Sequence, residues 1–99
     1  MQNNVEIVCF KLVSGASRDE FLAENQQVEA WVKQQTGFLS RQLCLSEEGI
    51  WTDIVVWDSA QNAKVAADQF VKELSTSTFM RMIDFSSVQM SHQNVLAAC

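Results

Sequence analysis

Two tryptophans and an aspartate alternate along the run Trp51-Thr-Asp-Ile-Val-Val-Trp57. The run from Ile50 to Trp57 is rich in β-branched and aromatic residues, which is typical of a strand. Residues two apart on a strand share a face, so Trp51, Asp53 and Trp57 point to the same side. Two indoles around a carboxylate are typical of the lining of a pocket for a flat, partly polar molecule.

A second strand-like run, Phe38 to Leu45, precedes this one, and the polar loop Ser46-Glu-Glu-Gly49 joins the two. A short loop that contains Gly between two such runs predicts a β-hairpin. We assume that all four loop residues lie outside the ladder, which sets the register. That register pairs Phe38 with Trp57, Gln42 with Asp53 and Cys44 with Trp51. The predicted ligand-binding residues are therefore Phe38, Gln42, Trp51 and Trp57.

A structural interpretation of the same residues stays open. In it the indoles belong to the core and Asp53 is a hydrogen-bonded or rim carboxylate. A register different by one residue would also change which residues of 38–45 join the tryptophans.

His92 is the only histidine of the chain. It alternates in phase with Val88 and Met90, which turns it toward an apolar side near the end of the last predicted strand. Histidine suits proton transfer near neutral pH, but a structural or exposed histidine also fits this position. A single histidine and the absence of a C-x-x-C pair predict no metal site. The sequence has no Gly-rich phosphate loop, no G-x-S-x-G motif and no tyrosine.

The remaining elements follow from periodicity and end signals. A β-rich run over 5–13 predicts the first strand. Ser17, with Glu20 three residues on, predicts the start of a helix over 18–35 that ends before Gly37. Ser59 caps a second helix over 60–74, helical turns follow at 79–83, and a last strand is expected at 85–92. The order is β-α-β-β-α-β, a ferredoxin-like α+β fold with a four-stranded antiparallel sheet and its helices on one face.

The predicted strands are apolar on both faces, which is unusual when helices cover only one face of a sheet. In the first strand Val5, Ile7 and Cys9 oppose Val8 and Phe10. Burial of both faces requires a second layer that one chain of this size cannot supply, so we expect a homodimer whose sheets pack face to face. The alternative is that a few exposed apolar side chains are ordinary.

Size and charge exclude several functional classes. The chain has 99 residues, of which 47% are apolar, and a net charge of -5. It is expected to form a single domain over 1–99, with a short tail at about 94–99. Because the chain has no basic patch, we expect that it binds neither nucleic acid nor a membrane surface. Three widely spaced cysteines and no signal-like N-terminus predict a cytoplasmic protein.

The segment Gly49-Ile-Trp-Thr-Asp-Ile-Val-Val-Trp-Asp-Ser59, followed by an Ala-rich helix, resembles the antibiotic biosynthesis monooxygenase (ABM) type domain of the dimeric α/β-barrel superfamily. Ser14-Gly15, Gly37-Phe38 and the segment 79–83 extend the resemblance over nearly the whole chain. The resemblance implies a dimer whose two sheets form a barrel, with a ligand cavity between the sheet and the helices of each subunit. The superfamily includes cofactor-independent oxygenases, haem-degrading enzymes and domains of unknown role.

The resemblance does not extend to the haem-degrading branch. That branch uses an Asn on the first strand, a Trp in the second helix and a His in the next helical segment. The matching positions here hold Val8, Ala66 and Ile83, and isoleucine cannot ligate iron. We therefore expect neither haem nor any other cofactor.

The cofactor-independent branch implies a protein that binds a small aromatic or quinol-type molecule and favours its deprotonated, oxidisable form. In this interpretation Trp51, Trp57 and Phe38 hold the ring, and Asp53 or His92 is the catalytic residue that handles the proton. The competing class is a ligand-binding or structural dimer without catalysis, which needs the same pocket but no proton-handling group.

Overall fold

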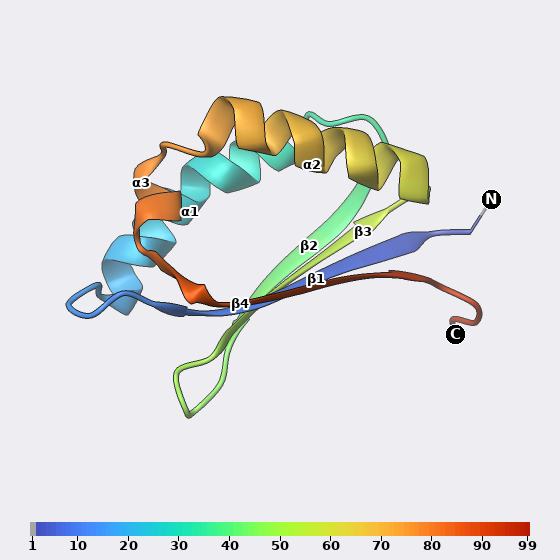
Figure 1. Ribbon diagram of the computed structural model, residues 1–99. Helices are drawn as coiled ribbons and strands as arrows, with labels where there is room; N and C mark the ends of the chain where they lie inside the picture. The colour runs from blue at the N-terminus through green and yellow to red at the C-terminus, as the bar shows by residue number, and fades with distance from the viewer. Residues whose placement is uncertain (1) are drawn as a thin grey trace.

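The computed structural model describes residues 2–99 as a four-stranded antiparallel sheet with its helices on one face (Figure 1). The elements are β1 (Asn4–Leu12), α1 (Arg18–Val32), β2 (Phe38–Leu45), β3 (Trp51–Trp57), α2 (Ala60–Leu74), α3 (Thr78–Arg81) and β4 (Ile83–Asn94). The strand order is β2-β3-β1-β4. The predicted ferredoxin-like fold is confirmed, although α1 ends three residues earlier than expected and β4 is longer at both ends.

A serine hydroxyl caps the N-terminus of each of the three helices. The Ser17 Oγ accepts a hydrogen bond from the Glu20 backbone N–H at 3.0 Å, and the Ser59 Oγ accepts one from Asn62 at 3.1 Å. Ser77 plays the same part for α3. Each bond satisfies a backbone donor that has no partner within the helix, so the two predicted caps are confirmed.

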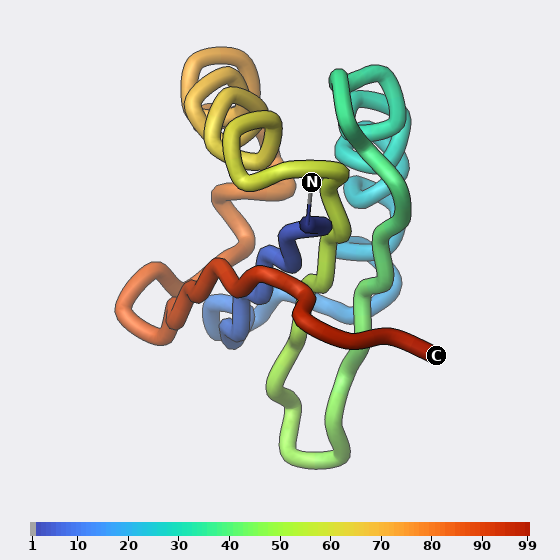
Figure 2. Tube along the Cα trace, turned by 90° about the vertical axis from the view of Figure 1, so that its right-hand side faces the viewer, coloured from blue at the N-terminus to red at the C-terminus, as the bar shows by residue number. Residues whose placement is uncertain are grey.

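The helices and the sheet enclose two separate apolar clusters. The first cluster is built on Phe10, Phe21, Val28, Trp51, Phe79, Met82 and Ile83. The second is built on Val32, Val55, Trp57, Ala63 and Ala66. The two tryptophans of β3 therefore belong to different clusters. Figure 2 shows the two long helices side by side above the sheet.

The predicted register of the β2–β3 hairpin is wrong by one residue over most of its length. The Ser46 N–H donates to the Ile50 carbonyl at 2.9 Å, so these two residues close a loop of only three, 47–49. Gly49 has a φ of +86°, which matches the three-residue loop that ends in a left-handed residue. Asp53 consequently faces Leu43, and Gln42 faces Ile54. The Phe38–Trp57 pair is confirmed because a bulge at 38–40 shifts the register back.

A larger irregularity interrupts the edge strand β4. Lys11 pairs with Asp84 while Cys9 pairs with Gln89, so the β4 residues between these partners loop out opposite Phe10. The Ser87 Oγ accepts from the Lys11 backbone N–H at 2.8 Å and donates to the Asp84 carbonyl at 2.6 Å. These bonds replace the ladder that the bulge removes.

The sheet face away from the helices is apolar at its centre. Half-buried side chains from the two central strands lie there: Val5, Ile7, Cys9, Ile54 and Val56. The outer strands place Gln42 and Gln89 on the same face. No element of residues 2–99 covers it (Figure 1).

Gly37 connects α1 to β2 at a place where no side chain fits. Its φ is +86°, and an added Cβ would lie 2.5 Å from the Asp58 Oδ1 and 2.7 Å from the Asn62 Cβ. Gly49 has the same φ, yet nothing lies within 4 Å of its missing Cβ. Substitution of Gly49 therefore tests backbone strain alone, whereas substitution of Gly37 tests strain and steric exclusion together.

We predict that Gly49→Ala lowers the free energy of unfolding by ~1–2 kcal/mol, the cost of the left-handed conformation. Gly37→Ala adds the cost of overpacking and should lower it by about 1–3 kcal/mol more. Urea denaturation followed by circular dichroism measures both. Equal losses in the two variants would show that the Asp58–Asn62 neighbourhood yields without cost.

Candidate functional site

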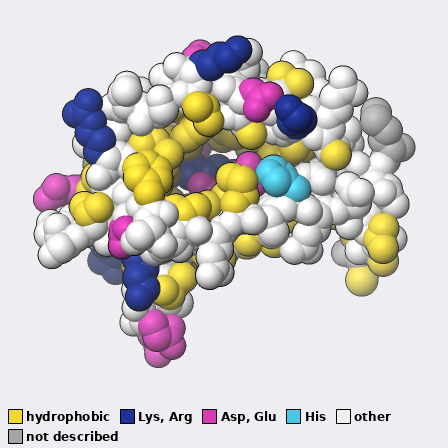
Figure 3. All heavy atoms as spheres, in the orientation of Figure 1, with side chains coloured by type: hydrophobic (Ala, Val, Ile, Leu, Met, Phe, Trp, Pro, Cys, Tyr) yellow, Lys and Arg dark blue, Asp and Glu magenta, His cyan; other side chains and the backbone are white. Residues whose placement is uncertain are grey.

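A hollow opens between the helices and the sheet on the side where β1 and β4 lie in front (Figure 3). Apolar side chains surround it, basic and acidic side chains are visible inside it, and a histidine lies at its rim. The polar side chains come from the face of the sheet that the helices cover. The register places Arg41, Glu6 and His92 in one row across this face, on β2, β1 and β4.

Arg41 and Asp53 form a buried, two-pronged ion pair. The Arg41 Nε donates to the Asp53 Oδ1 at 2.9 Å and the Arg41 Nη2 donates to the Oδ2 at 2.8 Å. The side chains are only 7% and 16% exposed. The Arg41 Nη1 also donates to the Asn25 Oδ1 on α1 at 2.7 Å. Both Arg41 and Asn25 line a pocket of about 360 Å³ between α1 and β2.

Glu6 is the second buried carboxylate of this face. Its side chain is 14% exposed, and its Oε2 lies 3.8 Å from the His92 Nε2. Burial raises the pKa of Glu6 above its ordinary value, while His92 opposes this rise and Asp53 adds to it. A carboxyl group with a raised pKa is a stronger base when ionised, which suits it to proton transfer.

Two buried polar atoms near Glu6 have no hydrogen-bond partner among residues 2–99. These atoms are the Trp57 Nε1 and the Asn4 Oδ1, on residues that face each other across β3 and β1. The Trp57 N–H lowers the pKa of Glu6, so it points toward that carboxyl without a hydrogen bond of good geometry. The Asn4 Nδ2 donates to the Asn94 Oδ1 at 3.1 Å. Unsatisfied buried groups of this kind are costly and call for an explanation, such as a bound molecule.

The structure brings some predicted site residues together and separates others. Phe38 lies edge-to-face against Trp57, with ring centroids 6.0 Å apart, and Asp53 and His92 share their face of the sheet. Trp51 lies in the other cluster, where it packs against Phe10 and Phe21. Gln42 is exposed on the opposite face, so its predicted pairing with Asp53 is wrong.

Four polar residues of the site were missed by the sequence analysis: Asn4, Glu6, Asn25 and Arg41. A signal for Glu6 was present, because a lone acidic residue stands on the same side of β1 as Val8 and Phe10. Leu43 holds the position opposite Asp53 that the predicted register assigned to Gln42, and Arg41 reaches the carboxylate from the diagonal position opposite Val55. The correct loop length would have identified it.

The fold defines the class of protein to which the chain is similar. Solved structures of antibiotic biosynthesis monooxygenase type share its ferredoxin-like α+β architecture over nearly their whole length. One of them, from Chloroflexus aurantiacus, is assigned provisionally as such a monooxygenase. It is 16% identical, with a TM-score of 0.71 over 98% of this chain and 96% of that one.

Two characterised neighbours come from Streptomyces. SnoaB, a cofactor-independent oxygenase from Streptomyces nogalater, is 18% identical with a TM-score of 0.70, over 100% of this chain and 96% of that one. The ActVA-Orf6 monooxygenase of Streptomyces coelicolor, solved with nanaomycin D, is 20% identical with a TM-score of 0.76, over 99% and 91%. A dimeric ferredoxin-like protein from an uncultured marine organism is 10% identical with a TM-score of 0.75, over 100% and 92%. At these identities the likeness concerns the fold.

Comparison of the sequence alone finds less. No protein-family model matches the chain, and no curated protein matches it. Within residues 2–99, no helix is long and apolar enough to cross a membrane. In the same residues no three His, Cys, Asp or Glu side chains gather in a way that could hold a metal ion.

The raised pKa of Glu6 predicts a pH-dependent cost of folding. The folded protein binds the Glu6 proton more tightly than the unfolded chain does. The stability gained from this proton is complete below the ordinary pKa of 4.5. It is lost as the pH rises through the folded value. We expect Glu6→Gln, which carries no charge to desolvate, to be more stable than the natural chain at pH 7, with the difference shrinking toward pH 4.

Urea denaturation between pH 4 and pH 8 measures this difference. Glu47→Gln, on the exposed hairpin loop, removes one negative charge from the surface and serves as the control. A Glu6→Gln variant that is less stable at pH 7 than at pH 4, relative to the natural chain, would contradict the assignment.

Proposed function

We propose that the protein is a homodimeric, cofactor-independent monooxygenase-like protein that binds a small aromatic or quinol-type molecule in the hollow. The carrying observation is the buried Glu6 carboxyl with a raised pKa beside the unpartnered Trp57 N–H and the Asn4 Oδ1. A phenol or quinol hydroxyl can accept a hydrogen bond from the Trp57 N–H and donate one to the Asn4 Oδ1. The shared fold of SnoaB and ActVA-Orf6, described as an oxygenase and a monooxygenase, supports the same activity.

The proposed reaction needs only a base, a hydrogen-bond donor and an apolar enclosure. Glu6 takes the proton from the activated C–H of the substrate, and His92, 3.8 Å away and partly exposed, passes it to solvent. The Trp57 N–H stabilises the negative charge that develops on the substrate oxygen. The carbanion then reduces dioxygen to a carbon-bound hydroperoxide. Loss of water leaves a carbonyl, so one CH2 group and O2 become one C=O group and H2O.

Asp53 takes a different part from the one the sequence suggested. Both Asp53 oxygens accept hydrogen bonds from Arg41, so one lone pair of each is already occupied. Glu6 is therefore better suited than Asp53 to accept a proton from a substrate. We assign Arg41 and Asp53 to the floor of the site and the base to Glu6, with His92 as the proton-handling partner. Phe38 supports the Trp57 ring.

Binding without turnover is the second candidate. The closed Arg41–Asp53 pair favours it, since this pair lies on the same face of the sheet and offers no base. Such a protein would use Trp57 and Asn4 to hold a hydroxyl but would not require Glu6 to be ionised.

The homodimer follows from the apolar centre of the uncovered sheet face. Five half-buried apolar side chains lie together there between polar outer strands. An apolar centre with a polar rim is the arrangement found in protein interfaces. The marine neighbour is a dimeric ferredoxin-like protein, which supports the same assembly.

The enzymatic proposal predicts oxygen uptake with anthrones, and with quinols that have a CH2 group in their keto form, at one O2 per substrate. Glu6→Gln should lower kcat ~10²-fold or more, the usual contribution of a general base. Trp57→Phe keeps a ring but removes the N–H, and should lower kcat ~10²-fold. Glu73→Gln makes the same chemical change as Glu6→Gln on the exposed surface of α2 and should have no effect.

An oxygen electrode measures the uptake, and fluorescence titration measures binding of the same compounds. Compounds that bind with no uptake by the natural chain would support the binding protein instead. Uptake that Glu6→Gln leaves unchanged would remove Glu6 from the mechanism.

The dimer proposal predicts that a charge at the centre of the uncovered face separates the subunits. Val56→Lys places a charge there, and we expect a monomer in size-exclusion chromatography with light scattering at micromolar concentration. Val65→Lys makes the same change on the exposed side of α2, where Val65 is 52% exposed, and should stay dimeric. A natural chain that is monomeric under these conditions would overturn the proposal.

A further inference from the structure

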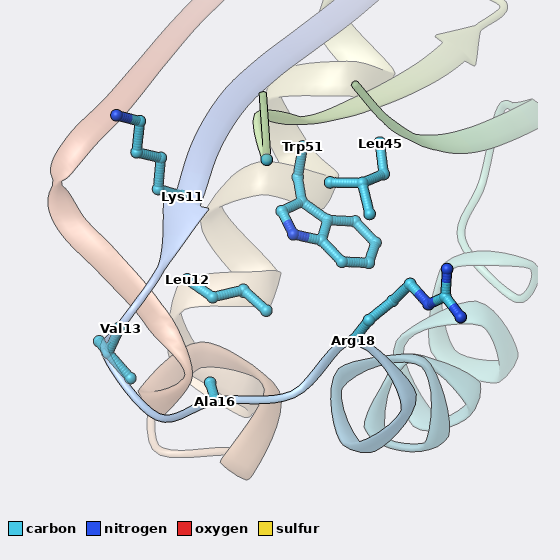
Figure 4. Close-up of a pocket in the computed structure, with 8 residues that line it drawn as sticks. Lys11, Leu12, Val13, Ala16, Arg18, Leu45 and Trp51 are labelled. Carbon is cyan, nitrogen blue, oxygen red and sulfur yellow. The ribbon is translucent and has the colours of Figure 1, made fainter. Parts of the chain in front are cut away.

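A second pocket lies at the far end of β3 from Trp57, where the hairpin loop meets the start of α1 (Figure 4). Its volume is about 320 Å³, which is within the range of small-molecule sites. The lining residues are Lys11, Leu12, Val13, Ala16, Arg18, Leu45, Gly49 and Trp51. None of the polar residues of the hollow is among them.

The walls of this pocket are apolar. Leu12, Val13 and Ala16 come from the end of β1 and the turn that follows, and Leu45 comes from the end of β2. Val13 and Leu45 are among the large apolar side chains that remain exposed. Exposed apolar groups that meet in a concave site favour a ligand with an apolar body.

Trp51 supplies the polar group of the pocket. The residue is 4% exposed, and its ring is held by a parallel contact with Phe10 and an edge contact with Phe21. Figure 4 shows the indole nitrogen turned toward Leu12 and the pocket. No hydrogen bond from this N–H is formed within residues 2–99. This N–H is not among the fully buried polar atoms that lack a partner, so it is open to the pocket, and the pocket suits a ligand that carries an acceptor.

The charges at the rim select the kind of acceptor. Arg18 and Lys11 are both among the lining residues, but Figure 4 shows the Lys11 side chain directed away from the indole, which leaves Arg18 as the cation on the pocket side. No acidic residue is among the lining residues, although Asp19 lies 3.6 Å from the Arg18 Nε and shares it. A flexible cation near an N–H donor is suited to an anionic oxygen.

We propose that this pocket binds a small carboxylate with a flat apolar body. Its apolar part lies between Leu12, Ala16 and Leu45, and its carboxylate accepts from the Trp51 N–H with Arg18 at close range. The aromatic cluster of Trp51, Phe10 and Phe21 is separate from the cluster that contains Trp57, so the pocket is distinct from the hollow.

Benzoate is the probe, with uncharged benzamide as its isostere. Each tryptophan contributes one indole N–H signal to a ¹⁵N–¹H correlation spectrum. Trp31→Phe and Trp57→Phe identify two of the signals and leave the third to Trp51, without disturbing the Trp51 cluster. We expect saturable shifts of the Trp51 signal with benzoate, and affinity for benzamide at least ~3-fold lower, as one exposed charge interaction provides.

Arg18→Gln should weaken benzoate binding about threefold and leave benzamide binding unchanged. Lys64→Gln removes the same charge from the exposed surface of α2 and should change neither. No shift of the Trp51 signal up to the solubility limit of benzoate would overturn the proposal, as would shifts confined to the Trp57 signal. Equal affinity for benzoate and benzamide would overturn the assignment of a carboxylate.

Discussion

The buried ion pair between Arg41 and Asp53 is the interaction on which the helix-facing side of the sheet depends. Removing either partner would leave an uncompensated charge between the sheet and the helices. Burying such a lone charge costs far more free energy than burying the ion pair. The pair joins β2 to β3, and the bond from Arg41 to Asn25 extends it to α1. Asp53 lies on β3 between Trp51 of the first apolar cluster and Val55 of the second. The polar floor of the hollow is thus a structural element as well as a chemical one.

Glu6 illustrates the opposite arrangement. The basic side chain within 4 Å of it is His92, at 3.8 Å and itself 39% exposed, so burial of the carboxyl is only partly compensated. The unpartnered Trp57 N–H and Asn4 Oδ1 add to the same local cost. Stability lost at one place in an otherwise well-packed domain is typical of functional sites, where groups are held ready for a ligand instead of for each other.

The sequence predicted the strands, the helices and their order because these rest on local signals. Serine caps, apolar periodicity and the glycine after the first helix act over a few residues. The predicted pairing of the site residues was wrong because it depended on the exact length of the hairpin loop. The loop has three residues instead of four, and this moved Gln42 out and Arg41 in. A bulge restored the Phe38–Trp57 pair by an opposite shift, which no local pattern announces. The Arg41–Asp53 ion pair joins two strands across the hairpin, so it appears only once the register is correct.

The bulge in β4 has a consequence for how copies of this chain can meet. A straight, unpaired edge strand offers its backbone donors and acceptors to any other strand, and growth of a sheet from edge to edge has no natural end. In β4 the residues between Asp84 and Gln89 leave the ladder, and the Ser87 hydroxyl bonds the Lys11 backbone N–H and the Asp84 carbonyl. The irregular edge disfavours open-ended strand addition. In the homodimer proposed above, the subunits meet instead through the apolar face of the sheet, where a pair closes the surface and growth stops at two.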